Sequence, residues 1–126
     1  MRATIKIEYV TDVLTTNWYG IGAEINVGRE LIKVASLYLP AKSANQAVYQ
    51  AIVLLLVEMP DEVTSILFRS SCQQFIKKTR LETRFAPIAN DHGVKLYVQN
   101  YRKHIPAVLL ATHAIERKAN VISITN

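Results

Sequence analysis

The sequence predicts an α/β domain in which a mixed five-stranded sheet carries helices on both faces. Three observations lead to this fold class. Three apolar-alternating segments joined by short turns come first, two strand patterns then alternate with helical patterns, and a last helical pattern follows. The predicted order is β-β-β-α-β-α-β-α. The chain has 126 residues and is 50% hydrophobic, which is enough apolar material for one domain spanning residues 1–126.

The first three strands are predicted from their alternation of apolar and polar side chains. Residues 4–10 alternate along their whole length, and residues 18–27 do the same after a short connection. Gly28-Arg29 is typical of a hairpin turn, and residues 30–39 form the third strand. Short turns join antiparallel neighbours, so these strands should form a meander.

The first helix has clear start and stop signals. Ser43 stands three residues before Gln46, which is the spacing of a capping box at a helix N-terminus. The helix should end at Met59, because Pro60 disfavours helical backbone in the residue before it. From Ala51 onward the helix is apolar all round, which indicates deep burial between a sheet and other elements.

The second half of the chain continues with alternating strand and helix patterns. Residues 64–68 form an apolar strand, and Ser70 or Ser71 can cap a second helix that runs to about Arg84. Residues 94–101 alternate and predict the fifth strand.

The last helix begins near Pro106 and ends at residues 117–118. Residues 121–126 fit either a short extra strand or a frayed tail. Because crossovers through a helix are right-handed and join parallel strands, the fourth and fifth strands should run parallel to the first.

Composition and charge narrow the classes of function. The formal net charge is +5, which favours an anionic partner, nucleic acid first. Cys72 is the one cysteine, so an internal disulfide is excluded and a reducing, cytoplasmic or otherwise intracellular compartment is expected. The first residues do not resemble a signal peptide, and the apolar run 51–57 is too short to span a membrane. The three histidines lack the cysteine partners of a zinc site.

Several local motifs, taken in order, resemble the type 1 ribonuclease H fold of the ribonuclease H-like superfamily. "YVTD" followed by "YGIGAEI" is similar to the family's first hairpin, and "SANQAVYQAIVLLL" is similar to its first long helix. "ILFRSSCQQFIKK" stands where the family has a strand, Thr-Asp-Ser and a helix. "KLYVQNYRKHI" and "HAIERKAN" resemble its last strand and last helix. Together these motifs cover nearly the whole chain.

The resemblance implies a nuclease site whose residues this chain largely lacks. The family cleaves RNA in hybrids with two divalent metals that four carboxylates hold. Asp12, or Glu8 on the same strand face, matches the first carboxylate. The other three positions fall near Ala47 and Val48, near Ser70 to Cys72, and around Leu110 to Thr112, with Glu116 as the nearest acid to the last. One carboxylate in four cannot hold two magnesium ions. We therefore expect no catalytic residues, no cofactor and, at most, weak metal ligation by Glu8 and Asp12.

The leading hypothesis is a catalytically inactive ribonuclease H-like domain that binds the backbone of RNA or DNA or acts as a scaffold. A guanidinium, hydroxyls and a helix N-terminus can grip phosphate, basic side chains can follow a backbone, and aromatic rings can stack on bases. The candidate residues are Arg69, Ser70, Ser71, Lys77, Lys78, Arg80, Arg84, Tyr97, Tyr101, Arg102, Lys103 and His104. Each group also has a structural interpretation, as a helix cap, a solvated helix face or an exposed strand face.

Two other functions stay open at this point. The domain can serve as a protein-interaction or homodimerisation module through an uncovered sheet edge or the apolar first helix. It can also be a magnesium-dependent nuclease with relocated carboxylates, for which Glu8, Asp12, Asp91 and Glu116 would have to converge.

Overall fold

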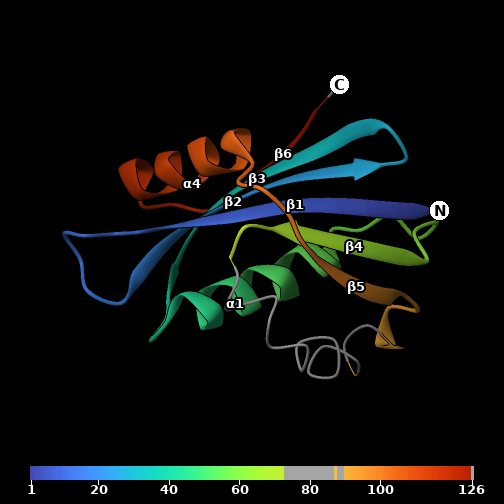
Figure 1. Ribbon diagram of the computed structural model, residues 1–126, viewed down its shortest axis with the longest axis horizontal. Helices are drawn as coiled ribbons and strands as arrows, with labels where there is room; N and C mark the ends of the chain where they lie inside the picture. Colours follow the sequence, from blue (N-terminus) through green and yellow to red (C-terminus); the bar gives the residue numbers. More distant parts are fainter. Residues whose placement is uncertain (73–86, 88–89, 126) are drawn as a thin grey trace.

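The computed structural model, which describes residues 1–72, 87 and 90–125, contains one mixed sheet with α1 on one face and α4 on the other (Figure 1). The elements follow one another as β1 (Arg2–Thr11), β2 (Trp18–Val27), β3 (Glu30–Pro40), α1 (Ala44–Val57), β4 (Ser65–Ser70), β5 (Lys95–Asn100), α4 (Ile105–Arg117) and β6 (Val121–Ile124). The predicted α/β class and the helices on both faces are confirmed. The helix predicted from Ser70 or Ser71 to about Arg84 lies almost wholly outside the described residues.

The strands lie in the order β5-β4-β1-β2-β3-β6. β1, β2 and β3 form the predicted antiparallel meander, and β4 and β5 continue the sheet in parallel on the other side of β1. The sheet has six strands where five were predicted, because residues 121–124 pair antiparallel with β3. Of the two alternatives for the C-terminal segment, the short extra strand is the one observed.

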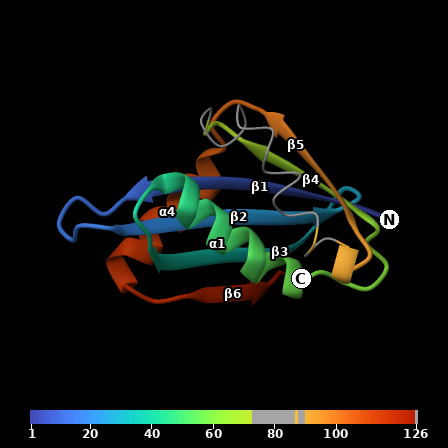
Figure 2. The same ribbon diagram turned by 90° about the horizontal axis from the view of Figure 1, so that it is seen from below.

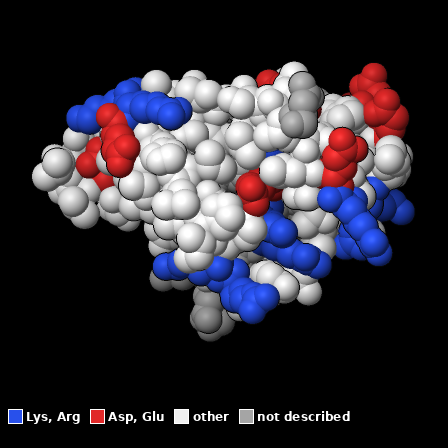
Figure 3. Space-filling view, turned by 90° about the horizontal axis from the view of Figure 1, so that it is seen from above, with Lys and Arg blue, Asp and Glu red and all other residues white. Residues whose placement is uncertain are grey.

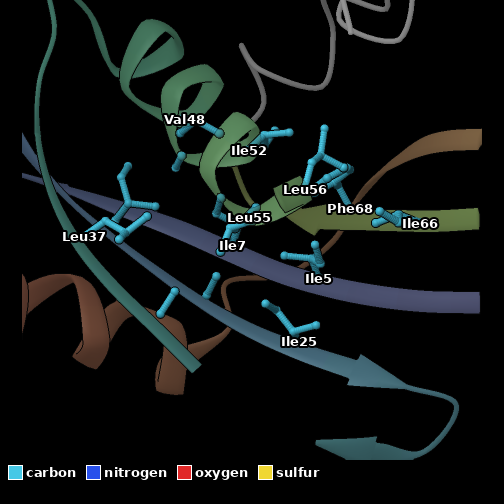
Figure 4. Packing of buried hydrophobic residues seen from close by; sticks show 14 of the residues in the cluster. Ile5, Ile7, Ile25, Leu37, Val48, Ile52, Leu55, Leu56, Ile66 and Phe68 are labelled. Carbon is cyan, nitrogen blue, oxygen red and sulfur yellow. The ribbon is translucent and has the colours of Figure 1, made fainter. Parts of the chain in front are cut away.

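The α1 face of the sheet contains the main hydrophobic core. Side chains alternate along a strand, so Ile5, Ile25 and Phe68, which are paired across β1, β2 and β4, point to the same side. They meet Ile52 and Leu55 of α1, and all five are at most 1% exposed (Figure 4). Burying each of these side chains contributes roughly 1.5–3 kcal/mol to the free energy of unfolding.

The predicted start of α1 is confirmed in detail. The Ser43 hydroxyl accepts a hydrogen bond from the Gln46 backbone N–H at 3.2 Å. The Gln46 side chain accepts one from the Lys42 backbone N–H at 2.7 Å, one residue before the position of an ideal capping box. The helix ends at Val57 with Glu58 as its cap, two residues before the predicted end.

The α4 face is built differently, because α4 rests on the backbone of β2. A Cβ atom added to Gly22 would lie 1.7 Å from the Ala107 carbonyl oxygen, and one added to Gly20 would lie 2.1 Å from the Ala111 carbonyl oxygen. Both alanines are fully buried. Two glycines facing two alanines therefore allow helix and strand to approach more closely than any larger side chain would permit.

Helix α4 covers only part of its face. It contacts β2 most extensively and β3 and β1 less, whereas β4 and β5 lie on the far side of β1 (Figures 1 and 2). No helix within the described ranges is long and apolar enough to cross a membrane.

Candidate nucleic-acid interface

The carboxylate of Glu8 is buried where β1 and β4 end, on the α4 face of the sheet. One of its oxygens accepts a hydrogen bond from the Ser71 hydroxyl at 2.5 Å, and the other accepts one from the Ser71 backbone N–H at 3.1 Å. The latter oxygen also lies 3.4 Å from the backbone nitrogen of His104. Glu8 thus ties β1 to the chain leaving β4 and to the chain entering α4. Leaving such a buried group without its partners costs about 1–3 kcal/mol.

A second carboxylate, that of Glu24, holds the start of α4. His104 is the N-cap residue of this helix, and its side chain makes no capping hydrogen bond. Its Nε2 atom instead contacts the Glu24 carboxylate on β2. The His104 side chain therefore links β2 to the chain that enters α4.

Asp12 is also buried and already engaged. The Tyr38 hydroxyl donates to one of its oxygens at 2.5 Å, and the backbone N–H groups of Leu14 and Thr15 donate to the other at 3.0 and 3.3 Å. The Trp18 ring stacks on Tyr38 at 4.6 Å. The tyrosine hydrogen bond lowers the pKa of Asp12 below its usual 3.8, and the same hydrogen bond raises the pKa of Tyr38. Asp12 shapes the turn between β1 and β2.

The positions that the resemblance assigns to the second and third carboxylates lie on the opposite face. Ala47 and Val48 are buried in α1, and Ser70 is 2% exposed on the same face as Phe68. The Ser70 hydroxyl accepts a hydrogen bond from the Cys72 backbone N–H at 3.1 Å. On the α1 side the ends of β1 and β4 therefore present apolar, hydroxyl and thiol groups.

These groups do not fit a pair of magnesium ions. Magnesium prefers oxygen ligands and is usually bound through carboxylates, and two ions in one site need several of them. Cys72 instead lies 4.0 Å from the Asn45 side-chain oxygen, beside Tyr9. The pKa of Tyr9 is raised, chiefly because burial disfavours the phenolate and next because of the neighbouring thiol. Glu8 and Asp12 have the right chemistry, but they lie on the other face of the sheet.

The fourth carboxylate position and the acids within the described residues do not complete a site. At Leu110 the carbonyl accepts a hydrogen bond from the Ser36 hydroxyl at 2.6 Å, and the Thr112 hydroxyl donates to a carbonyl within α4. Glu116 is exposed on α4, and Asp91 is exposed shortly before β5. Among the described residues, no three histidine, cysteine, aspartate or glutamate side chains lie close enough together to hold a metal ion.

The basic and aromatic candidates of β4, β5 and the following segment do come together. Arg69 donates from its Nε atom to the Gln99 side chain at 3.0 Å, and its guanidinium lies 4.9 Å from the centre of the Tyr101 ring. The Arg102 guanidinium lies 5.9 Å from the same ring. Lys103 follows in the exposed segment before α4. Figure 3 shows blue side chains gathered along the lower edge of the α4 face, on the side of β4 and β5.

Other predicted binding residues have different surroundings. Ser70 is buried toward α1, and Ser71 is held by Glu8. Their hydroxyls therefore have hydrogen-bond partners within the fold, and phosphate binding by Arg69, Ser70 and Ser71 together stays a prediction. Lys77, Lys78, Arg80 and Arg84 lie outside the described residues.

The sequence analysis missed the residues that flank Arg69 across the sheet. Lys6 on β1 is the direct neighbour of Arg69, and Glu24 on β2 is the direct neighbour of Lys6. Gln99 and Lys95 on β5 complete this surface. The sequence did contain a signal, since the first and fourth strands were predicted to be parallel. Once their register is known, this arrangement places Lys6 beside Arg69.

Comparisons with known proteins agree with this architecture. No family model and no curated protein matches the sequence. Among solved structures, LC9-RNase H1, a type 1 RNase H with the type 2 active-site motif, superimposes with a TM-score of 0.68 at 10% sequence identity, over 99% of this chain and 78% of that one. The prototype foamy virus protease-reverse transcriptase superimposes with a TM-score of 0.61 at 13% identity, over 90% of this chain and 20% of the viral chain. The chain therefore has the ribonuclease H-like fold, as its motifs predict.

Proposed function

We propose that this chain is a ribonuclease H-like domain that binds nucleic acid without cleaving it. The observation that supports the proposal most strongly is the division of chemistry between the two sheet faces. On the α1 face, Ser70 and Cys72 at the end of β4 and Asn45 in the first turn of α1 stand in place of a carboxylate cage. On the α4 face, cations and aromatic rings gather beside β4 and β5.

The proposal does not depend on the absence of acids from the sequence, but on where the acids lie. Glu8 and Asp12 each accept at least two short hydrogen bonds from the protein, and they are four residues apart on an extended strand, roughly 13 Å. The two ions of a two-metal site lie only about 4 Å apart, so the carboxylates that hold them must converge on one place. The two carboxylates therefore serve the fold, and binding is the activity that the remaining surface supports.

A titration of fluorescently labelled RNA–DNA hybrid, duplex DNA and single strands, with and without magnesium, tests the proposal. We expect binding that weakens steeply as salt rises from about 50 to 200 mM, because the release of cations from the phosphates favours binding and becomes less favourable as salt rises. We expect no cleavage at any magnesium concentration. Magnesium-dependent cleavage that disappears in Glu8→Gln would contradict the proposal and support relocated carboxylates.

A second candidate is homodimerisation through the edge formed by α1, β3 and β6. An open groove of about 380 Å³ lies there, lined by Leu37, Leu54, Val57, Glu58, Asn120 and Ile122. Leu54 and Val57 are exposed, and β6 is a short edge strand with Val121 and Ile124 exposed. If no nucleic acid binds, sedimentation of the chain as a dimer that Leu54→Glu dissociates would favour this function.

A further inference from the structure

We propose that the uncovered part of the α4 face is a binding surface for single-stranded nucleic acid. This inference rests on the proposed function and narrows it to one face and one substrate class. The surface, called the open half below, consists of Lys6, Arg69, Lys95, Tyr97, Gln99, Tyr101 and Arg102, and the buried Leu67 lies beneath it.

Strand register places these side chains on one side of the sheet. Leu67 of β4 pairs with Tyr97 of β5, and Arg69 pairs with Gln99. Leu67 does not belong to the hydrophobic core against α1, in agreement with its position on the opposite face. Lys6 of β1 pairs with Arg69, so the row Lys6, Arg69, Gln99 crosses three strands. The open half is thus a continuous surface on regular strands.

The aromatic rings of the open half are partly exposed, and the guanidiniums of Arg69 and Arg102 lie over the Tyr101 ring. Tyr97 is 46% exposed and Tyr101 is 40% exposed. They are four positions apart along extended chain, which corresponds to roughly 13 Å. Arg69 is held between the Gln99 amide and the Tyr101 ring, so its guanidinium plane is positioned before any ligand arrives. Tyrosine rings and guanidinium planes both stack on bases whose faces are free.

The charge of the open half favours a polyanion. Lys6, Arg69, Lys95 and Arg102 are cationic, and Lys103 follows directly in the chain. Glu8 lies on the same strand as Lys6, and Glu24 of β2 is paired with Lys6. Glu8 is buried against Ser71, and Glu24 contacts His104, so both are turned to partners within the fold. Figure 3 shows the resulting band of blue along this edge of the face.

Single strands fit this surface better than duplexes. Phosphates of either form can contact the cations, but only unpaired bases expose the faces on which Tyr97 and Tyr101 can stack. A duplex would use the cations alone and leave two half-exposed rings without a role. Stacking also tolerates any base, so we expect little dependence on sequence.

The test compares the affinity of wild type and variants for labelled oligothymidylate and oligouridylate of about 16 nucleotides by fluorescence anisotropy. We expect Kd for single strands to rise about tenfold in Tyr97→Ala/Tyr101→Ala, and to change less than about twofold in Tyr97→Phe/Tyr101→Phe, because phenylalanine keeps the ring. Arg102→Ala should weaken binding several-fold more than Lys42→Ala, which removes the same charge from the connection between β3 and α1.

The outcomes separate this inference from the proposed function. If wild type binds none of the nucleic acids, the proposed function fails and this inference fails with it. If wild type binds, but the double alanine variant binds single strands equally well, the open half is not the site while the proposed function stands. Tighter binding of duplex than of single strands would likewise overturn the choice of substrate. Circular dichroism spectra and thermal midpoints of the surface variants should match the wild type.

Discussion

The two faces of this sheet pack against their helices through different kinds of residue. Against α1, large aliphatic and aromatic side chains such as Ile7, Phe68 and Leu55 interlock in a layer that excludes water. Against α4, Gly20 and Gly22 let the helix rest directly on the strand backbone. The first face is covered to form a core, whereas the second leaves β4 and β5 beyond the helix.

The difference explains where polar groups can be placed. A dense apolar core has no room for ionised ligands, and on the α1 side the residues at and just after the end of β4 include Ser70 and Cys72, both buried. The α4 face accommodates buried carboxylates because neighbouring loops and helix ends supply hydrogen-bond donors to them. The open half of the α4 face can therefore contain cationic and aromatic side chains without disturbing the core.

The largest expected effect follows from filling the glycine contact. Gly22→Ala places a Cβ atom 1.7 Å from the Ala107 carbonyl oxygen and 2.7 Å from the Ala111 backbone nitrogen. The helix must move away, so we expect the free energy of unfolding to fall by about 3 kcal/mol. Urea denaturation measures this loss.

Gly28→Ala is the matched control for this substitution. Gly28 has a φ of 61° in the turn between β2 and β3, and no atom lies within 4 Å of its added Cβ. Backbone strain alone should cost about 1 kcal/mol there. Equal losses in the two variants would mean that α4 does not rest on β2 as closely as described.

A smaller and pH-dependent effect should follow from removing the Tyr38 hydroxyl. Its hydrogen bond depresses the folded pKa of Asp12 below 3.8, so the stability that it contributes is present above about pH 4 and is lost as the pH falls through the folded pKa. Tyr38→Phe should therefore lower Tm by a few degrees at pH 7, and the difference from wild type should shrink below about pH 3.

Thermal melts of both proteins across this pH range measure the effect. Asp61→Asn, an exposed carboxylate in the connection between α1 and β4, is the control and should leave the acid dependence unchanged. A Tyr38→Phe difference that is the same at both ends of the range would show that the tyrosine acts through packing on Trp18 rather than through the Asp12 carboxylate.

Much of the fold could be predicted because alternation, capping and turn signals act locally. Ser43 and Gln46 mark a helix start within four residues, and Gly28 marks a hairpin. The sixth strand could not be decided locally, because residues 121–124 become a strand only by pairing with β3. The contact between Glu24 and His104 joins residues eighty positions apart, and no local pattern announces it.

The different orientations of Arg69 and Ser70 could not be predicted, because they depend on where the fourth strand ends. The fourth strand was expected to end at Phe68, but β4 continues to Ser70. Alternation along these extra residues turns Arg69 to the open half and Ser70 into the core, which separates two residues that had been grouped together. The orientation of Glu8 could be predicted from the sequence. Ile5 and Ile7 form the apolar face of the same strand, so Glu8 must point to the opposite face.

The measurement that tests the central claim most directly is a titration of ¹⁵N-labelled protein with oligothymidylate, followed through amide chemical shifts. The account predicts that shifts concentrate on the open half, at Lys6, Arg69, Gln99 and Tyr101. It also predicts that Asn45 and Ser70, on the α1 side of the sheet, stay unperturbed. Shifts confined to that α1 side would contradict the account.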